Sequence, residues 1–83
     1  MSDPDRSIAD HVEQLVAEEH RLLDLGGQEG GLSPEQHARL ERVRVELDQL
    51  WDLIRQRRAL REAGMNPAGA SERPASEVEG YLQ

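Results

Sequence analysis

The sequence predicts an all-α fold: an antiparallel helical hairpin of two long helices with an extended C-terminal arm. An apolar stripe with alternating three- and four-residue spacings over residues 40–54 is typical of one buried side of a helix. A shorter stripe over residues 8–22 provides a partner, and the glycine-rich segment between them allows the chain to reverse. The stripes consist of Ile8, Val12, Leu15 and Leu22, and of Leu40, Val43, Leu47, Leu50 and Ile54.

Each predicted helix begins at residues that favour helix N-termini. Asp3 and Pro4 suit an N-cap and a first helical position. Ser33, Pro34 and Gln36 provide the second start, with the glutamine three residues after the cap in the capping-box arrangement. We therefore expect helices over about residues 4–25 and 34–63 and a loop over residues 26–33.

The composition changes after Gly64. Residues 65–83 are rich in proline, alanine and serine, which is typical of an extended arm, so the hairpin is expected to occupy residues 1–64. Ser76 can cap a short helical turn over residues 76–82 that carries Val78, Tyr81 and Leu82. We expect this apolar tip to dock on its own hairpin or on a dimer mate, near the overhanging end of the second helix. The alternative is a short linear motif that captures another protein.

The two stripes predict the register of the hairpin. In an antiparallel arrangement Leu22 lies near Leu40, and Leu15 lies near Leu47. Three apolar residues of the second helix lie off the seam, the line of contact between the two stripes. A hairpin alone would leave them exposed to solvent. We therefore expect a homodimer, most simply a dimeric four-helix bundle. The residues off the seam are Val45, Leu53 and Leu60.

Trp51 is the largest apolar side chain and flanks the longer stripe. We expect it to be buried at the interface between the helices. Glu19 occupies a seam position near Val43, within reach of Arg39 or Arg42. We expect a partly buried ion pair that fixes the register, with a ligand or partner contact as the alternative.

Composition restricts the function classes. The formal net charge of -7 weighs against general affinity for nucleic acid or an anionic membrane. Without cysteine there is no disulfide framework and no thiolate zinc site, which fits a reducing compartment. The acidic N-terminus does not resemble a signal peptide, and no apolar run is long enough for a membrane span. We expect a cytoplasmic protein with no membrane association.

Histidine and acidic residues do not form a metal-binding pattern. Di-iron bundles use Glu-x-x-His on facing helices, a motif that this chain lacks. Several of these residues are instead four apart, as ordinary pairs on a helix surface are. We therefore expect no metal and no cofactor. The residues considered were His11, Glu18, Glu19, His20, Asp24, His37 and Glu41.

Four arginines gather near the end of the second helix, at Arg55, Arg57, Arg58 and Arg61. They make a nucleic-acid or ribosome-associated adaptor the first alternative function. Cations also suit a helix C-terminus, and the acidic start of the first helix should lie alongside. We therefore expect these arginines to be structural and regard nucleic acid as an unfavoured partner.

An enzyme is the second alternative. The stretch LDQLWDLIRQRR is similar to the long first helix of all-helical chorismate mutases, where arginines also follow. That fold needs a third substantial helix with a lysine or arginine to clamp a dianionic substrate. The corresponding region here contains two prolines, and the chain has no lysine. We expect no enzymatic activity and no catalytic residue.

Three stretches resemble a family of small actinobacterial proteins known only as a domain of unknown function: EEHRL, LDQLWDLIRQRRALREAG and RPASEVEGYLQ. The resemblance covers nearly the whole chain and implies an actinobacterial, intracellular helical protein. It implies no activity, so no catalytic residue can be carried over. The chain departs from the family pattern at Asn66, where an acidic residue is common, and in its more glycine-rich loop.

These observations predict a protein-interaction or scaffolding module whose partners are a second copy of itself and an unknown protein. The candidate contact residues combine the apolar residues off the seam, the arginine segment, the apolar tip and the seam glutamate. They are Trp51, Leu53, Leu60, Arg57, Arg58, Val78, Tyr81, Leu82 and Glu19.

Overall fold

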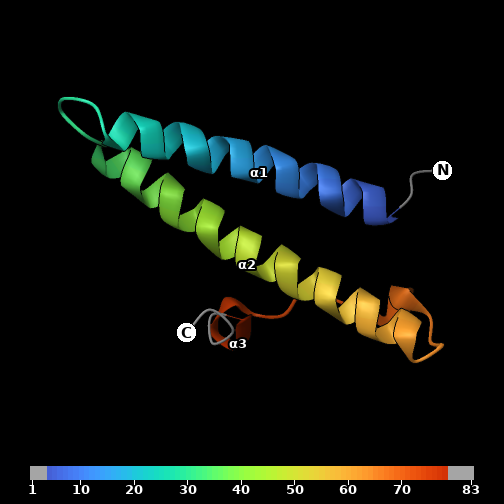
Figure 1. Ribbon diagram of the computed structural model, residues 1–83. Coiled ribbons are helices and arrows are strands. Elements are labelled where there is room, and N and C mark those ends of the chain that lie inside the picture. The colour runs from blue at the N-terminus through green and yellow to red at the C-terminus, as the bar shows by residue number, and fades with distance from the viewer. Residues whose placement is uncertain (1–3, 79–83) are drawn as a thin grey trace. The chain divides into compact units, whose positions relative to one another are not determined.

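The computed structural model describes residues 4–78, and all of the regular structure in that range is helical. The elements in chain order are α1 (Pro4–Gly26), α2 (Pro34–Glu62), the 3-10 turn η1 (Pro67–Gly69) and α3 (Ala75–Val78) (Figure 1). The chain divides into two compact units, Met1–Leu47 and Asp48–Gln83, and α2 contributes to both.

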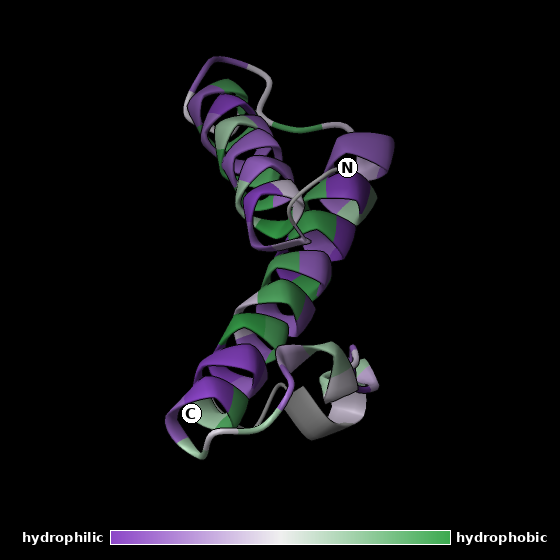
Figure 2. Ribbon diagram, turned by 90° about the vertical axis from the view of Figure 1, so that its right-hand side faces the viewer, coloured by the Kyte–Doolittle hydropathy of each residue, from purple (hydrophilic) through white to green (hydrophobic). Residues whose placement is uncertain are grey.

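The first unit is the predicted helical hairpin. Helix α1 and the N-terminal part of α2 run antiparallel and side by side (Figure 1). Both helices show apolar residues interspersed with polar ones, as expected for helices with one buried side (Figure 2). The core is built from the residues of the two stripes, which confirms the hairpin. Its buried apolar residues are Val12, Leu15, Leu22, Leu40, Val43 and Leu47.

Glycine permits the reversal between the two helices. The Gly27 amide donates to the carbonyl oxygens of Leu23 and Asp24 and so closes the last turn of α1, each at 3.2 Å. Gly30 and Gly31 then adopt φ angles of +92° and +60°, which L side chains rarely adopt. Side chains at these two positions would strain the loop.

Helix α2 begins with the predicted capping box. The Gln36 amide donates to Ser33 Oγ at 3.1 Å, and the Ser33 amide donates to Gln36 Oε1 at 2.8 Å. Two amides at the helix start, which have no partner within the helix, are therefore satisfied reciprocally.

The second unit contains the C-terminal part of α2, η1 and α3. Helix α2 ends in a Schellman motif: the Gly64 amide donates to the Arg61 carbonyl at 3.0 Å, and the Met65 amide donates to the Leu60 carbonyl at 2.7 Å. Gly64 has φ +74°, the left-handed conformation that this motif requires. The chain reverses here.

The arm returns along the helix that it has just left. Asn66 caps η1, since its Oδ1 accepts a bond from the Ala68 amide at 2.9 Å. Gly69 then lies against Leu60: a Cβ atom built on Gly69 would be 3.8 Å from Leu60 Cδ1. Leu60, one of the residues off the seam, is therefore partly covered by the arm of its own chain.

The capping box generates a test. Ser33→Ala should lower the free energy of unfolding by about 1 kcal/mol, because one amide of the first turn loses its acceptor. Ser7→Ala, at an exposed position within α1, is the matched control and should change stability by less than about 0.5 kcal/mol. Urea unfolding followed by circular dichroism measures both, and equal losses would contradict a capping role for Ser33.

Candidate functional site

The most distinctive polar site in the described part of the chain is built around Asp52. Its side chain is only 1% exposed on α2, and burying a carboxylate without partners is costly. Arg73 of the arm supplies a two-pronged partner: Nε donates to Oδ2 at 2.8 Å, and Nη2 donates to Oδ1. Gln56, one turn further along α2, donates from Nε2 to Oδ2 at 2.8 Å. Both carboxylate oxygens are therefore satisfied.

Two glutamines of α2 also bind the backbone of the arm. Gln56 donates to the Ser71 carbonyl at 2.7 Å and accepts from the Ser71 amide at 3.3 Å, so its side chain pairs with the arm as a neighbouring strand would. Gln49 donates to the Arg73 carbonyl at 3.3 Å. We call the set Gln49, Asp52, Gln56, Ser71 and Arg73 the arm clasp.

The electrostatics of the clasp favour the charged pair. The hydrogen bond from Arg73 lowers the pKa of Asp52 below its usual range. Burial acts in the opposite direction, and the bond from Gln56 adds to the lowering. Asp52 is therefore an ionised carboxylate at neutral pH.

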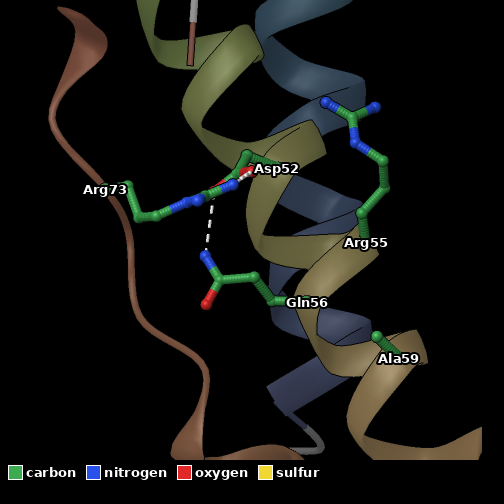
Figure 3. A pocket seen from close by; sticks show the side chains of 5 residues that line it. All are labelled: Asp52, Arg55, Gln56, Ala59 and Arg73. Atoms are coloured by element: carbon green, nitrogen blue, oxygen red, sulfur yellow. Dashed lines mark hydrogen bonds and ion pairs between the residues drawn. The ribbon is translucent and has the colours of Figure 1, made fainter. Parts of the chain in front are cut away.

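A small hollow of about 220 Å³ adjoins the clasp, lined by Asp52, Arg55, Gln56, Ala59 and Arg73 (Figure 3). The side chains of Asp52, Gln56 and Arg73 point toward one another, whereas Arg55 points away from them. The chemistry of this arrangement is that of a tether: it holds an extended segment on a helix. Among the described residues, no group of three or more histidine or acidic side chains is arranged to hold a metal ion.

The first unit contains its own ion pairs across the hairpin. Glu18 pairs with Arg39 through two bonds, of which Nη2 to Oε1 measures 2.7 Å. The hydrogen bond from Arg39 lowers the pKa of Glu18. Glu19 Oε2 lies 3.5 Å from Arg44 Nε. Glu19 was expected to pair with Arg39 or Arg42. That expectation is wrong: Arg39 forms its ion pair with the neighbouring Glu18, and Glu19 pairs with Arg44.

The expected burial of Trp51 is also wrong for the single chain. Its side chain is 43% exposed, whereas Leu50 beside it is buried. Successive residues on a helix point about 100° apart, so the position next to a buried leucine need not share its environment. Trp51 is one of three large apolar residues that stay exposed in the described part of the chain, with Leu23 and Met65.

The other candidate residues of α2 have different environments. Arg57 is half-buried and donates from Nη1 to the Pro67 carbonyl at 3.2 Å, so it contributes to holding the arm. Arg58 is exposed, while Leu53 and Leu60 are half-buried. Val45 is half-buried in the first unit and lines a hollow of about 320 Å³ together with Glu41, Arg42 and Glu46.

The apolar tip of the arm lies beyond what the structure describes. Tyr81 and Leu82 are outside the described residues, and for Val78 only the backbone, in α3, is described. Within the described residues, the arm contacts α2 through residues 67–73. Sequence reasoning did not single out Asp52, Gln56 or Arg73. The available signal was an Asp and a Gln four residues apart on the off-seam side of α2, followed by an arginine in an arm of mostly small residues.

No helix in residues 4–78 is both long enough and apolar enough to cross a membrane.

The fold and the clasp define a small all-α protein, a helical hairpin whose second helix carries its own C-terminal arm. The chain belongs to the family described as "Protein of unknown function (DUF2630)", which it matches over residues 4–83. This confirms the resemblance to a family of unknown function.

Mycobacterial proteins are among its relatives. The uncharacterized protein Rv0898c of Mycobacterium tuberculosis is 51% identical over 72 residues, which cover 86% of this chain and 82% of the relative. The uncharacterized protein Mb0922c of Mycobacterium bovis matches with the same identity and coverage. No solved structure matches the chain.

The clasp predicts that the arm stabilises the fold. Arg73→Gln should lower the free energy of unfolding by about 1 to 2 kcal/mol, because Asp52 then stays buried without its cation. The loss is limited because the Arg73 side chain is 35% exposed, so part of its charge interaction is screened by solvent. Glu72→Gln, at the exposed neighbouring position of the arm, is the control and should be nearly neutral. Chemical unfolding measures both, and an Arg73→Gln variant as stable as the control would refute the role of the clasp.

The lowered pKa of Asp52 predicts a dependence on pH. Its stabilisation is complete above the pKa of the unfolded chain, near 4, and is lost as the pH falls through the lower folded-state pKa. The stability difference between the native protein and Asp52→Asn should therefore be largest at pH 7 and shrink as the pH falls below about 4. Urea unfolding at a series of pH values measures it. Asp10→Asn, an exposed control on α1, should stay close to the native protein throughout, and a constant difference for Asp52→Asn would contradict the ionised pair.

Proposed function

We propose that the protein is a small non-enzymatic interaction module that associates with a second copy of itself. The observation that carries this proposal is Trp51, which is 43% exposed on α2 in the single chain. Tryptophan buries a large apolar area and is enriched in protein interfaces. A second copy that covers Trp51 would remove this surface from water.

The size of the core supports association. The described part of the chain buries seven apolar residues, all of them leucine or valine. Small domains bury a lower fraction of their surface than large ones and are correspondingly marginal in stability. Covering further apolar surface in a dimer would stabilise the folded chain, since association and folding are then linked.

The clasp changes where such an interface should lie. The sequence argument for a dimer included Leu60, but the arm already lies against Leu60 through Gly69. The arm occupies the side of α2 formed by Gln49, Asp52 and Gln56. We therefore place the interface on the side that carries Trp51. A four-helix bundle of two hairpins remains the simplest assembly of this kind.

Nucleic acid and substrate chemistry receive less support. In the arginine segment, Arg57 donates to the arm at Pro67, and the chain as a whole is acidic with a formal net charge of -7. Within the described residues, the side chains at the clasp engage each other in a structural tether. The cytoplasm is the proposed location, as the sequence suggested. Affinity purification from the native host would identify a further protein partner.

The proposal predicts a dimer that depends on Trp51. Sedimentation at tens of micromolar protein should give the dimer mass, and the melting temperature should rise with protein concentration. Trp51→Ala should shift the protein toward monomer and reduce that concentration dependence. Leu23→Ala, at a comparably exposed leucine of α1 (46%), is the matched control and should remain dimeric.

Two results would contradict this function. The first is a native protein that sediments as a monomer at tens of micromolar with a concentration-independent melting temperature. The second is a native dimer that Trp51→Ala leaves intact, which would place the interface elsewhere. Circular dichroism of each variant establishes that it has folded before its mass is interpreted.

A further inference from the structure

Four residues form one side of the C-terminal part of α2. Asp48, Trp51, Arg55 and Arg58 follow one another at spacings of three, four and three, so their side chains lie along one side of the helix. Trp51 is 43% exposed, Arg55 and Arg58 are exposed, and Asp48 is half-buried. We call these four residues the tryptophan face.

The tryptophan face has a symmetric charge pattern. Asp48 and Arg58 lie five residues before and five residues after Leu53. Trp51 and Arg55 lie two residues before and two residues after it. A twofold axis at that level would bring Asp48 of one copy opposite Arg58 of the other, and Trp51 opposite Arg55. Each contact would then occur twice, as in any isologous interface.

Resting on the self-association proposed above, we propose that two copies pair their α2 helices antiparallel through the tryptophan face, centred at the level of Leu53. Oppositely charged side chains then meet at both ends of the contact. At its centre each arginine guanidinium lies over an indole ring, an arrangement that attracts a cation to the ring face. The occupant of this face is a second copy of the chain.

The charges select this orientation over a parallel one. Parallel pairing in register would bring Asp48 against Asp48, Arg55 against Arg55 and Arg58 against Arg58, which is repulsive at every charged position. Antiparallel pairing replaces these repulsions with attractions. The arm binds α2 on another side of the helix, through Gln49, Asp52 and Gln56.

Charge reversal tests the pairing. Asp48→Arg and Arg58→Asp should each raise the dissociation constant of the homodimer about tenfold or more, because each variant sets like charges together at both ends. An equimolar mixture of the two variants should recover a dimer, since Arg at position 48 of one chain then faces Asp at position 58 of the other. Sedimentation of each variant and of the mixture measures this, and circular dichroism verifies folding.

Cross-linking tests the orientation independently, because the chain has no cysteine of its own. Asp48→Cys with Arg58→Cys in one chain should form disulfide-linked dimers under mild oxidation. Asp48→Cys alone should not, since its two copies would be about 15 Å apart along the helix. Efficient linking of the single variant, or a mixture of charge variants that stays monomeric, would overturn the antiparallel arrangement but leave self-association standing. A monomeric native protein would overturn both.

Discussion

A carboxylate that is removed from water needs a partner, and the position of the C-terminal arm depends on this constraint. Asp52 is almost completely buried on α2, and the described residues that bond to its carboxylate are Arg73 and Gln56. Since Arg73 is 21 residues away in the chain, the pair is formed only when the arm folds back. The Schellman motif at Gly64 makes that return geometrically easy, and the glutamine bonds fix the path of the arm.

This tether gives the sides of α2 different roles. One side contributes leucine and valine to the buried core, including Leu50 in the second unit. Another side holds the arm through hydrogen bonds and the Asp52–Arg73 ion pair. A third side presents Trp51. A helix of 29 residues can serve all three because side chains 100° apart on successive positions reach different surroundings.

Local rules predicted the helices well. The capping box at Ser33 and the spacing of the core leucines act within a few residues, so the sequence alone reveals them. The partner of Glu19 and the burial of Trp51 were predicted wrongly, because each depends on how neighbouring side chains compete for the same space. Glu18 takes Arg39, so Glu19 pairs with Arg44 instead.

The clasp was not predicted, for a different reason. Asp52 sits between Trp51 and Leu53 in a polar, charged helix and looks like an ordinary surface residue in the sequence. Its burial is a consequence of the returning arm, which is a long-range contact that no local pattern specifies. The apolar residues off the seam were a genuine signal that α2 needs a second partner. For Leu60 that partner is the arm of the same chain.

The central claim is that the Asp52–Arg73 pair holds the arm on α2, and a double-mutant cycle tests it most directly. Asp52→Asn, Arg73→Gln and the double variant are unfolded in urea at pH 7, and the coupling energy is taken from the three stability differences. We expect a favourable coupling of about 1 to 2 kcal/mol, as for a hydrogen-bonded ion pair with one part-exposed member. Losses that simply add, with a coupling near zero, would show that the two residues act independently and would contradict the account.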